Sequence, residues 1–241
     1  PSDPPALPLD TATHADVRDA MLKPAGIASP YVRVGHSLGS YHVRQYANTR
    51  FEKMAGMVLV DPSGDGQKAR FNAELPDLIR ELDKLGEAAK AAGCIERLRE
   101  KLVLRGDPLF AQCNGTNDPD LFEQTQSEID SMEGASTAQL VASRRSYGDM
   151  PLIVLTRGDN EKGMPPELTK ADREGFVKIW TQMHEEMTAL SSAGERRVIA
   201  GAGHSIQRDK PQAVSEAVNE VVARARSKAS APQLGAPRDA P

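Results

Sequence analysis

The sequence predicts an α/β protein built on a doubly wound, mainly parallel sheet. Four short runs rich in β-branched residues stand out, at 31–34, 57–60, 152–155 and 197–200. Most of these runs are apolar at successive positions, as expected for parallel strands that are buried on both faces. Stretches with helical periodicity separate the runs, and this alternation of strand and helix is typical of a doubly wound sheet.

The first half of the pattern lies near the start of the chain. A helix is expected before the strand 31–34, and Pro24 ends it because proline cannot continue a helix. A second helix over 41–54 follows the strand and leads to the next strand, 57–60. The apolar positions that indicate the first helix are Ala15, Val17, Ala20 and Met21.

The second half of the pattern lies at the other end of the chain. After the strand 152–155, an apolar stripe at spacings of three and four predicts a helix that ends before Gly194. After the strand 197–200, a similar stripe predicts the last helix, with Pro211 suited to its first turn. The two stripes consist of Phe176, Ile179, Trp180, Met183, Met187 and Leu190, and of Val214, Ala217, Val218, Val221, Val222 and Ala225.

One long insertion interrupts this pattern. Residues 64–149 hold no convincing strand but several helical stretches, and they divide the predicted core into 10–63 and 150–226. Because an insertion between parallel strands projects from one edge of the sheet, we expect a helical cap or lid over a site. A plain structural insertion is the alternative. The proline-rich ends, 1–9 and 227–241, are expected to be flexible.

Composition excludes several classes of function. The 241 residues suffice for one large domain or two small ones. Lys and Arg number 30 against 34 Asp and Glu, and neither sign gathers into a block, so a nucleic-acid surface is not expected. No window is apolar for long enough to span a bilayer. No metal-binding cluster, phosphate-binding glycine loop or flavin signature occurs, so no metal and no cofactor are expected.

The two cysteines, Cys94 and Cys113, exclude a zinc ribbon and a dense disulfide scaffold. Either one loop-closing disulfide or two unrelated buried thiols fits their positions. The chain shows no secretory signal peptide, although a mature or truncated chain would not show one. A bacterial cytoplasmic location and a secreted or periplasmic location therefore both stay open.

The sharpest local motif is Gly35-His36-Ser37-Leu38-Gly39, directly after the first strand and before a helix. In this context G-x-S-x-G is typical of a nucleophile elbow, in which small neighbours permit a strained turn that exposes the serine hydroxyl. The backbone N–H of Leu38 would serve as an oxyanion donor, supported by the positive end of the helix. A simple glycine turn with an idle serine is the alternative.

A serine nucleophile needs a base, and His204 is the histidine best placed for that role. It follows the last strand and precedes the final helix, which puts it at the same sheet edge as Ser37. His36 lies inside the elbow, but its side chain is expected to point away. His14, His42 and His184 fall on predicted helices and are interpreted as surface or packing residues.

Together these features resemble the α/β-hydrolase fold family of serine esterases and lipases. The resemblance covers about residues 10–226 and is carried by the runs YVRVGHSLGSYHVRQYA, MVLVDPS, PLIVLTRG and GAGHSIQRDKP. It implies hydrolysis of carboxylic esters by a Ser-His-acid triad through an acyl-enzyme intermediate, with a small-molecule ester as substrate. Apolar faces in the cap favour lipophilic acyl groups. The serine at 37 argues against a haloalkane dehalogenase, which would use an aspartate.

The resemblance implies two candidates for the triad acid. Most members carry it after the strand corresponding to 152–155, where Asp159 fits with a shift of one residue. Other members carry it after the strand that follows the nucleophile helix, and here that residue is Asp61. Asp61 is slightly favoured because it needs no shift.

The chain departs from the family pattern before the strand 31–34. Members ordinarily have four more strands there, and a His-Gly loop supplies a second oxyanion N–H. Only about thirty residues precede the strand, so those strands are expected to be absent. The strand 31–34 would then be an exposed edge that invites self-association, and the oxyanion hole would have one donor. A catalytically impaired or ligand-binding relative, or a truncated fragment of a larger hydrolase, is the alternative interpretation.

Overall fold

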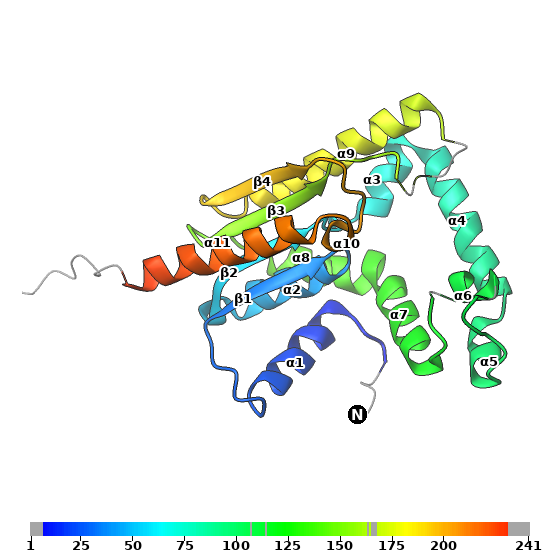
Figure 1. Ribbon diagram of the computed structural model, residues 1–241, viewed down its shortest axis with the longest axis horizontal. Coiled ribbons are helices and arrows are strands. Elements are labelled where there is room, and N and C mark those ends of the chain that lie inside the picture. Colours follow the sequence, from blue (N-terminus) through cyan, green and yellow to red (C-terminus); the bar gives the residue numbers. More distant parts are fainter. Residues whose placement is uncertain (1–6, 107, 114, 163, 165–167, 231–241) are drawn as a thin grey trace, which may run out of the picture.

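The computed structural model describes residues 7–106, 108–113, 115–162, 164 and 168–230 (Figure 1). Most of the ends expected to be flexible, at 1–6 and 231–241, lie outside the described residues. Where the ends are described, the side chain of Leu9 is buried and residues 227–230 continue the last helix.

Four parallel strands form one sheet in the order β1-β2-β3-β4, which confirms the predicted α/β fold class. The strands are β1 Tyr31–His36, β2 Met54–Val60, β3 Leu152–Arg157 and β4 Gly194–Ile199. The strands β2 and β4 begin earlier than their apolar runs because glycine and charged residues join the ladder through backbone pairing. His36 pairs with Val60, and Val60 pairs with Leu155, so the first three strands end at one edge.

Helices cover both faces of the sheet (Figure 1). The helices α2 Gly39–Thr49 and α9 Lys170–Thr188 pack on one face, and α11 Pro211–Ser230 packs on the other. Alternate residues of β2 and β3 enter two separate hydrophobic clusters, as the period of two in a strand requires. The cluster below α2 and α9 contains Met57, Leu59, Leu152 and Val154, and the cluster below α11 contains Val58, Val60, Ile153 and Leu155.

Most of the other helices come between β2 and β3 in the sequence. In the described part of 64–149 the structure has helices and no strand. These elements are α3 Gln67–Glu74, α4 Pro76–Ala91, α5 Cys94–Arg99, α6 Pro108–Gln112, α7 Pro119–Ser131, the π-helical turn η2 Met132–Ser136 and α8 Thr137–Ser143. The chain also contains α1 Thr11–Leu22, the 3-10 turn η1 Phe51–Lys53 and the short α10 Ile206–Asp209. In Figure 1, α4 to α7 extend beyond the edge at which the strands end.

Cys94 and Cys113 form a disulfide within this helical segment, so the first of the two alternatives for the cysteines holds. Their Cα atoms are 5.5 Å apart, within the range that a disulfide spans. The buried side chains of Leu98 and Val103 pack around the disulfide in a small core of their own. The disulfide therefore ties α5 to the chain that follows α6.

The strand β1 is an edge of the described sheet, because β2 is its one partner there. The exposed fraction of Val34 is 43%, whereas every residue of β3 is buried. The guanidinium of Arg33 stacks on the ring of Tyr46, which covers part of the face beneath this edge.

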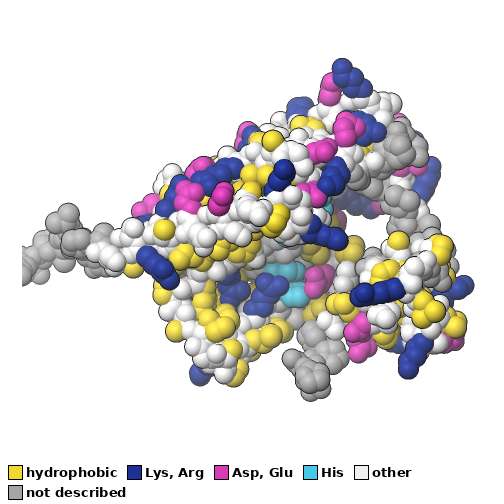
Figure 2. Space-filling view, in the orientation of Figure 1, with side chains coloured by type: hydrophobic (Ala, Val, Ile, Leu, Met, Phe, Trp, Pro, Cys, Tyr) yellow, Lys and Arg dark blue, Asp and Glu magenta, His cyan; other side chains and the backbone are white. Residues whose placement is uncertain are grey.

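The surface carries both signs of charge. On the face shown in Figure 2, Lys and Arg side chains alternate with Asp and Glu side chains and do not form one continuous patch. Among the described helices, none combines the length and apolar character needed to cross a membrane.

Candidate active site

Ser37 lies on a strained turn between β1 and α2. Its φ of 51° is in the left-handed region, which costs a non-glycine residue about 1–3 kcal/mol and persists where the surroundings enforce it. Two backbone hydrogen bonds hold the turn, because the Ser37 N–H donates to Val60 O and the Ser63 N–H donates to Ser37 O. The turn is therefore anchored to the end of the neighbouring strand.

The two glycines of the motif have different roles in this turn. A Cβ at Gly35 would lie 2.6 Å from the carbonyl oxygen of Gly39, closer than any side chain tolerates. A Cβ at Gly39 would meet nothing within 4 Å. Packing therefore requires glycine at 35 and leaves room for a side chain at 39.

The Leu38 N–H lies at the start of α2, one residue after Ser37. Within the part of the chain that the structure describes, this N–H donates to no acceptor. The first N–H groups of a helix carry partial positive charge and attract anions. A bound oxyanion beside Ser37 could therefore accept this hydrogen bond.

His204 connects Ser37 to Asp61. Its Nε2 lies 3.0 Å from Ser37 Oγ, and its Nδ1 lies 2.6 Å from Asp61 Oδ2. Because a carboxylate only accepts hydrogen bonds, Nδ1 carries the proton in this arrangement. In the neutral imidazole Nε2 is then free to accept the hydroxyl proton of Ser37.

Asp61 directly follows β2 and is fully buried. Other groups besides His204 donate hydrogen bonds to it. Its Oδ1 accepts from the Arg157 backbone N–H and from Trp180 Nε1, and its Oδ2 accepts from Arg157 Nε at 2.8 Å. Burial alone would raise the pKa of Asp61, but the hydrogen bond from His204 and the charge of Arg157 hold it below its ordinary value. The carboxylate is therefore ionised at neutral pH.

Arg157 and Trp180 were not among the residues that the sequence indicated for this site. The guanidinium of Arg157 packs over the Trp180 and Phe176 rings, 4.8 Å and 5.3 Å from their centres, and its Nη2 lies 3.3 Å from His204 Nδ1. The position of Arg157 at the end of a parallel strand could have indicated it as a site residue, because ligands bind at the edge where such strands end. Trp180 had no such signal, since its place in the apolar stripe of α9 indicates only a core residue.

Asp159, the other candidate acid, has a different environment. Its Oδ1 accepts from the backbone N–H groups of Glu161 and Lys162, and its own N–H donates to Ala202 O. The described contacts of Asp159 thus stabilise the turn after β3, and none of them reaches His204.

His36 and His184 both contact this region. The expectation that His36 points away from the site is wrong, because its Nε2 donates to the carbonyl oxygen of His204 at 2.9 Å. His184 is fully buried, and burial lowers its pKa to about 4. Its Nε2 donates to Pro62 O, so its Nδ1 accepts from Thr156 Oγ1. His184 therefore fixes the chain directly after Asp61.

A cavity of about 1170 Å³ opens over Ser37 and His204. It lies between the sheet and the helical segment, where Figure 2 shows the molecule hollowed. Lys68, Lys162 and several carboxylates add charge around the apolar surface. The apolar lining comes from α3, α4, α5, α7, α9 and their loops and includes Phe71, Leu78, Ile79, Ile95, Phe122, Ile129, Met132, Met164, Phe176 and Trp180.

Comparison with known families gives one clear match. A family model described as "Alpha/beta hydrolase family" matches residues 1–217. A curated relative, the "Uncharacterized protein YqjL" of Bacillus subtilis (strain 168), is 23% identical over 203 residues, which are 84% of this chain. The chain thus spans 61% of the length of that relative.

Two solved structures share the fold of the chain. One belongs to a study of carboxylesterases from the thaumarchaeon Nitrososphaera gargenis, with a TM-score of 0.55, 17% identity, and coverage of 91% of this chain and 74% of that one. The other is a probable hydrolytic enzyme of Pseudomonas aeruginosa PAO1, with a TM-score of 0.56 and 17% identity, covering 92% and 72%. At such identities the likeness shows the fold alone.

Proposed function

The chain belongs to the alpha/beta hydrolase family, and from this premise we propose that it is a serine hydrolase that cleaves carboxylic esters. The observation that carries the proposal is the continuous hydrogen-bond path from Ser37 through His204 to Asp61, with links of 3.0 and 2.6 Å. A nucleophile, a base and a buried acid in this order are the parts that acyl transfer requires.

The proposed reaction has two steps. His204 Nε2 takes the proton of Ser37 as Oγ attacks the ester carbonyl, and the same proton passes to the alcohol that leaves. Water then attacks the acyl-enzyme and gives a proton to His204. The bond between the acyl carbon and Ser37 Oγ breaks, the acid leaves, and His204 returns the proton to Oγ. Asp61 holds the imidazole in the required tautomer and stabilises the imidazolium formed in each step.

The Leu38 N–H is the proposed oxyanion donor. It lies at the helix start beside Ser37 and donates to no described acceptor, so it can bind the oxygen that becomes negative. Removing one oxyanion donor typically costs about 10² to 10³ in kcat, so this single N–H accounts for a substantial part of the expected rate.

The cavity over Ser37 supports a lipophilic substrate. Its walls carry aromatic and aliphatic side chains from the helical segment, which we propose acts as a lid over the ester. Burial of apolar surface contributes about 25 cal/mol per Å², so an acyl chain that fills this space would gain affinity with each added carbon.

A fluorophosphonate probe tests the proposal. It should label the wild-type chain at Ser37, as located by peptide mass spectrometry, and p-nitrophenyl esters should be hydrolysed. Ser37→Ala should abolish both signals, while Ser205→Ala, a serine in the same loop as His204, should keep them. Neither labelling nor hydrolysis in protein with the circular dichroism of a folded α/β domain would reject the assignment.

A further inference from the structure

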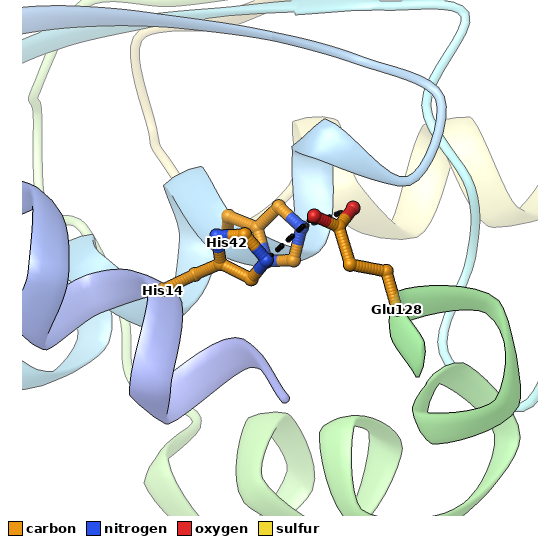
Figure 3. A group of neighbouring side chains, drawn as sticks. All are labelled: His14, His42 and Glu128. Carbon is orange, nitrogen blue, oxygen red and sulfur yellow. Dashed lines mark hydrogen bonds and ion pairs between the residues drawn. The ribbon is translucent and has the colours of Figure 1, made fainter. Parts of the chain in front are cut away.

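Three polar side chains meet away from the active site. His14 comes from α1, His42 from α2 and Glu128 from α7, and Figure 3 shows both imidazoles directed toward the carboxylate. His14 Nε2 lies 2.7 Å from Glu128 Oε1, and His42 Nε2 lies 3.5 Å from Glu128 Oε2. One donor atom from each residue lies within 4.8 Å of the other two.

Hydrogen bonding leaves this cluster poorly satisfied. The His14 Nε2 atom is buried, and despite its short distance to Glu128 it has no hydrogen-bond partner of regular geometry among the described residues. The side chain of His42 is only 3% exposed, and its Nε2 contact with Glu128 is at the long limit for a hydrogen bond. Buried polar groups without good partners cost free energy unless something else binds them.

We propose that His14, His42 and Glu128 bind a divalent transition-metal ion, with Zn²⁺ as the type case. Two imidazole nitrogens and one carboxylate oxygen are ligands that this ion accepts, and water would complete four-fold coordination. Ligands at 2.0 to 2.1 Å from a tetrahedral ion are about 3.3 Å apart. The separations of 2.7 and 3.5 Å involve the two different oxygens of Glu128, and one ligand atom from each residue lies within 4.8 Å of the other two. Side-chain rotations would therefore have to bring both imidazole nitrogens and one carboxylate oxygen to this spacing.

The ligand set, with a nearby positive charge, indicates the class of ion. Arg18, one turn after His14 in α1, interacts electrostatically with Glu128 and offsets part of its charge. Ca²⁺ and Mg²⁺ require several oxygen ligands, and this cluster offers one carboxylate. Imidazole nitrogen instead suits transition-metal ions such as Zn²⁺ or Ni²⁺.

The sequence did not indicate this site, because its ligands come from three separate helices and follow no short spacing motif. An ion held there would join α1 and α2 to α7. Phe122 and Ile129 of the same helix α7 line the cavity above Ser37. Metal binding would therefore fix one wall of the cavity while leaving Ser37 and His204 untouched.

Metal titration of the untagged, chelator-treated 241-residue chain tests the site. Calorimetry should show one equivalent of Zn²⁺ bound, and Co²⁺ should give the intense visible absorption of tetrahedral coordination. At a hundredfold excess of Zn²⁺ over its Kd, the melting temperature should rise by roughly 5–10 °C.

Glu128→Gln should weaken binding by at least about 100-fold, because it removes a direct ligand. Glu123→Gln, on the same helix and paired with Arg99, should bind the metal as the wild type does. His14→Ala provides a second ligand variant if Glu128→Gln fails to fold. Absence of Zn²⁺ binding by the wild type, or unchanged affinity in a folded ligand variant, would overturn the proposal.

Discussion

Arg157 and Asp61 form a buried ion pair, in which Arg157 Nε donates to the same carboxylate oxygen that contacts His204. The side chains are 8% and 0% exposed, so little solvent screens the pair. Arg157 holds the carboxylate from one side while His204 contacts it from another. The geometry of the candidate acid thus depends on a residue that contacts neither Ser37 nor the elbow in the described structure.

We predict that Arg157→Met destabilises the fold and raises the pKa of Asp61. Loss of one partner leaves a buried charge uncompensated, which costs about 3 kcal/mol in the free energy of unfolding. Urea denaturation at pH 7 measures the first effect, and NMR titration of the carboxyl carbon measures the second. Arg157→Lys keeps a positive charge and should lose less stability. Equal stability of Arg157→Met and wild type would contradict the prediction.

Substitution of the two candidate acids separates their roles. Asp61→Asn should lower kcat for ester hydrolysis by about 10⁴, because the imidazole loses the partner that sets its tautomer. Asp159→Asn is the matched control, and kcat should change little because its described contacts reach only the turn after β3. A large loss of kcat in Asp159→Asn together with a small one in Asp61→Asn would reverse the assignment.

The sequence predicted the sheet well because its strands carry a strong local signal. The strands β2 and β3 are buried on both faces, and the runs 57–60 and 152–155 within them are wholly apolar. The predicted start of β4, at residue 197, comes after its actual start at Gly194. The first residues of the strand are Gly194, Glu195 and Arg196, which are not typical of strands. Backbone pairing with β3 includes them all the same.

The site could be predicted only in part, because some of its contacts join residues that lie far apart in the sequence. Ser37 lies in a contiguous motif, and His204 follows a strand end, so local patterns indicated both as candidates. Asp61 and Asp159 each follow a parallel strand, and the sequence could not show which one faces His204. The contacts of Asp61 with Arg157 and Trp180 join residues 96 and 119 positions apart, and no local pattern encodes such distances.

A second buried ion-pair group should make stability depend on pH. Asp65 contacts Arg44 Nη1 at 2.6 Å and Arg144 Nη2 at 2.7 Å, and its side chain is 8% exposed. Burial alone would raise the pKa of Asp65, but the two guanidinium groups hold it below its ordinary value. A depressed folded-state pKa adds stability above the unfolded value of about 3.9, and that stability is lost as pH falls through the folded value.

Asp65→Asn should therefore be less stable than the wild type at pH 7 by about 3 kcal/mol, with the difference shrinking at pH values below about 4. Urea denaturation across this pH range measures the effect. Asp149→Asn, which removes an exposed contact with Lys228, is the control and should leave stability nearly unchanged. A difference that stays constant from neutral to acidic pH would show that ionisation of Asp65 is not its source.

The two glycines of the elbow should respond in opposite ways to alanine. A Cβ at Gly35 would collide with the backbone at Gly39 and Ser40, so Gly35→Ala must displace the start of α2. We expect it to lower the free energy of unfolding by about 1–3 kcal/mol and to weaken fluorophosphonate labelling of Ser37.

Gly39→Ala adds a methyl group in open space at the first turn of a helix, where alanine favours helix formation more than glycine does. It should fold with equal or slightly higher stability and keep its labelling, as thermal unfolding and the probe would show. If both variants behaved alike, the elbow would not have the close approach between Gly35 and Gly39 that places Ser37 beside His204.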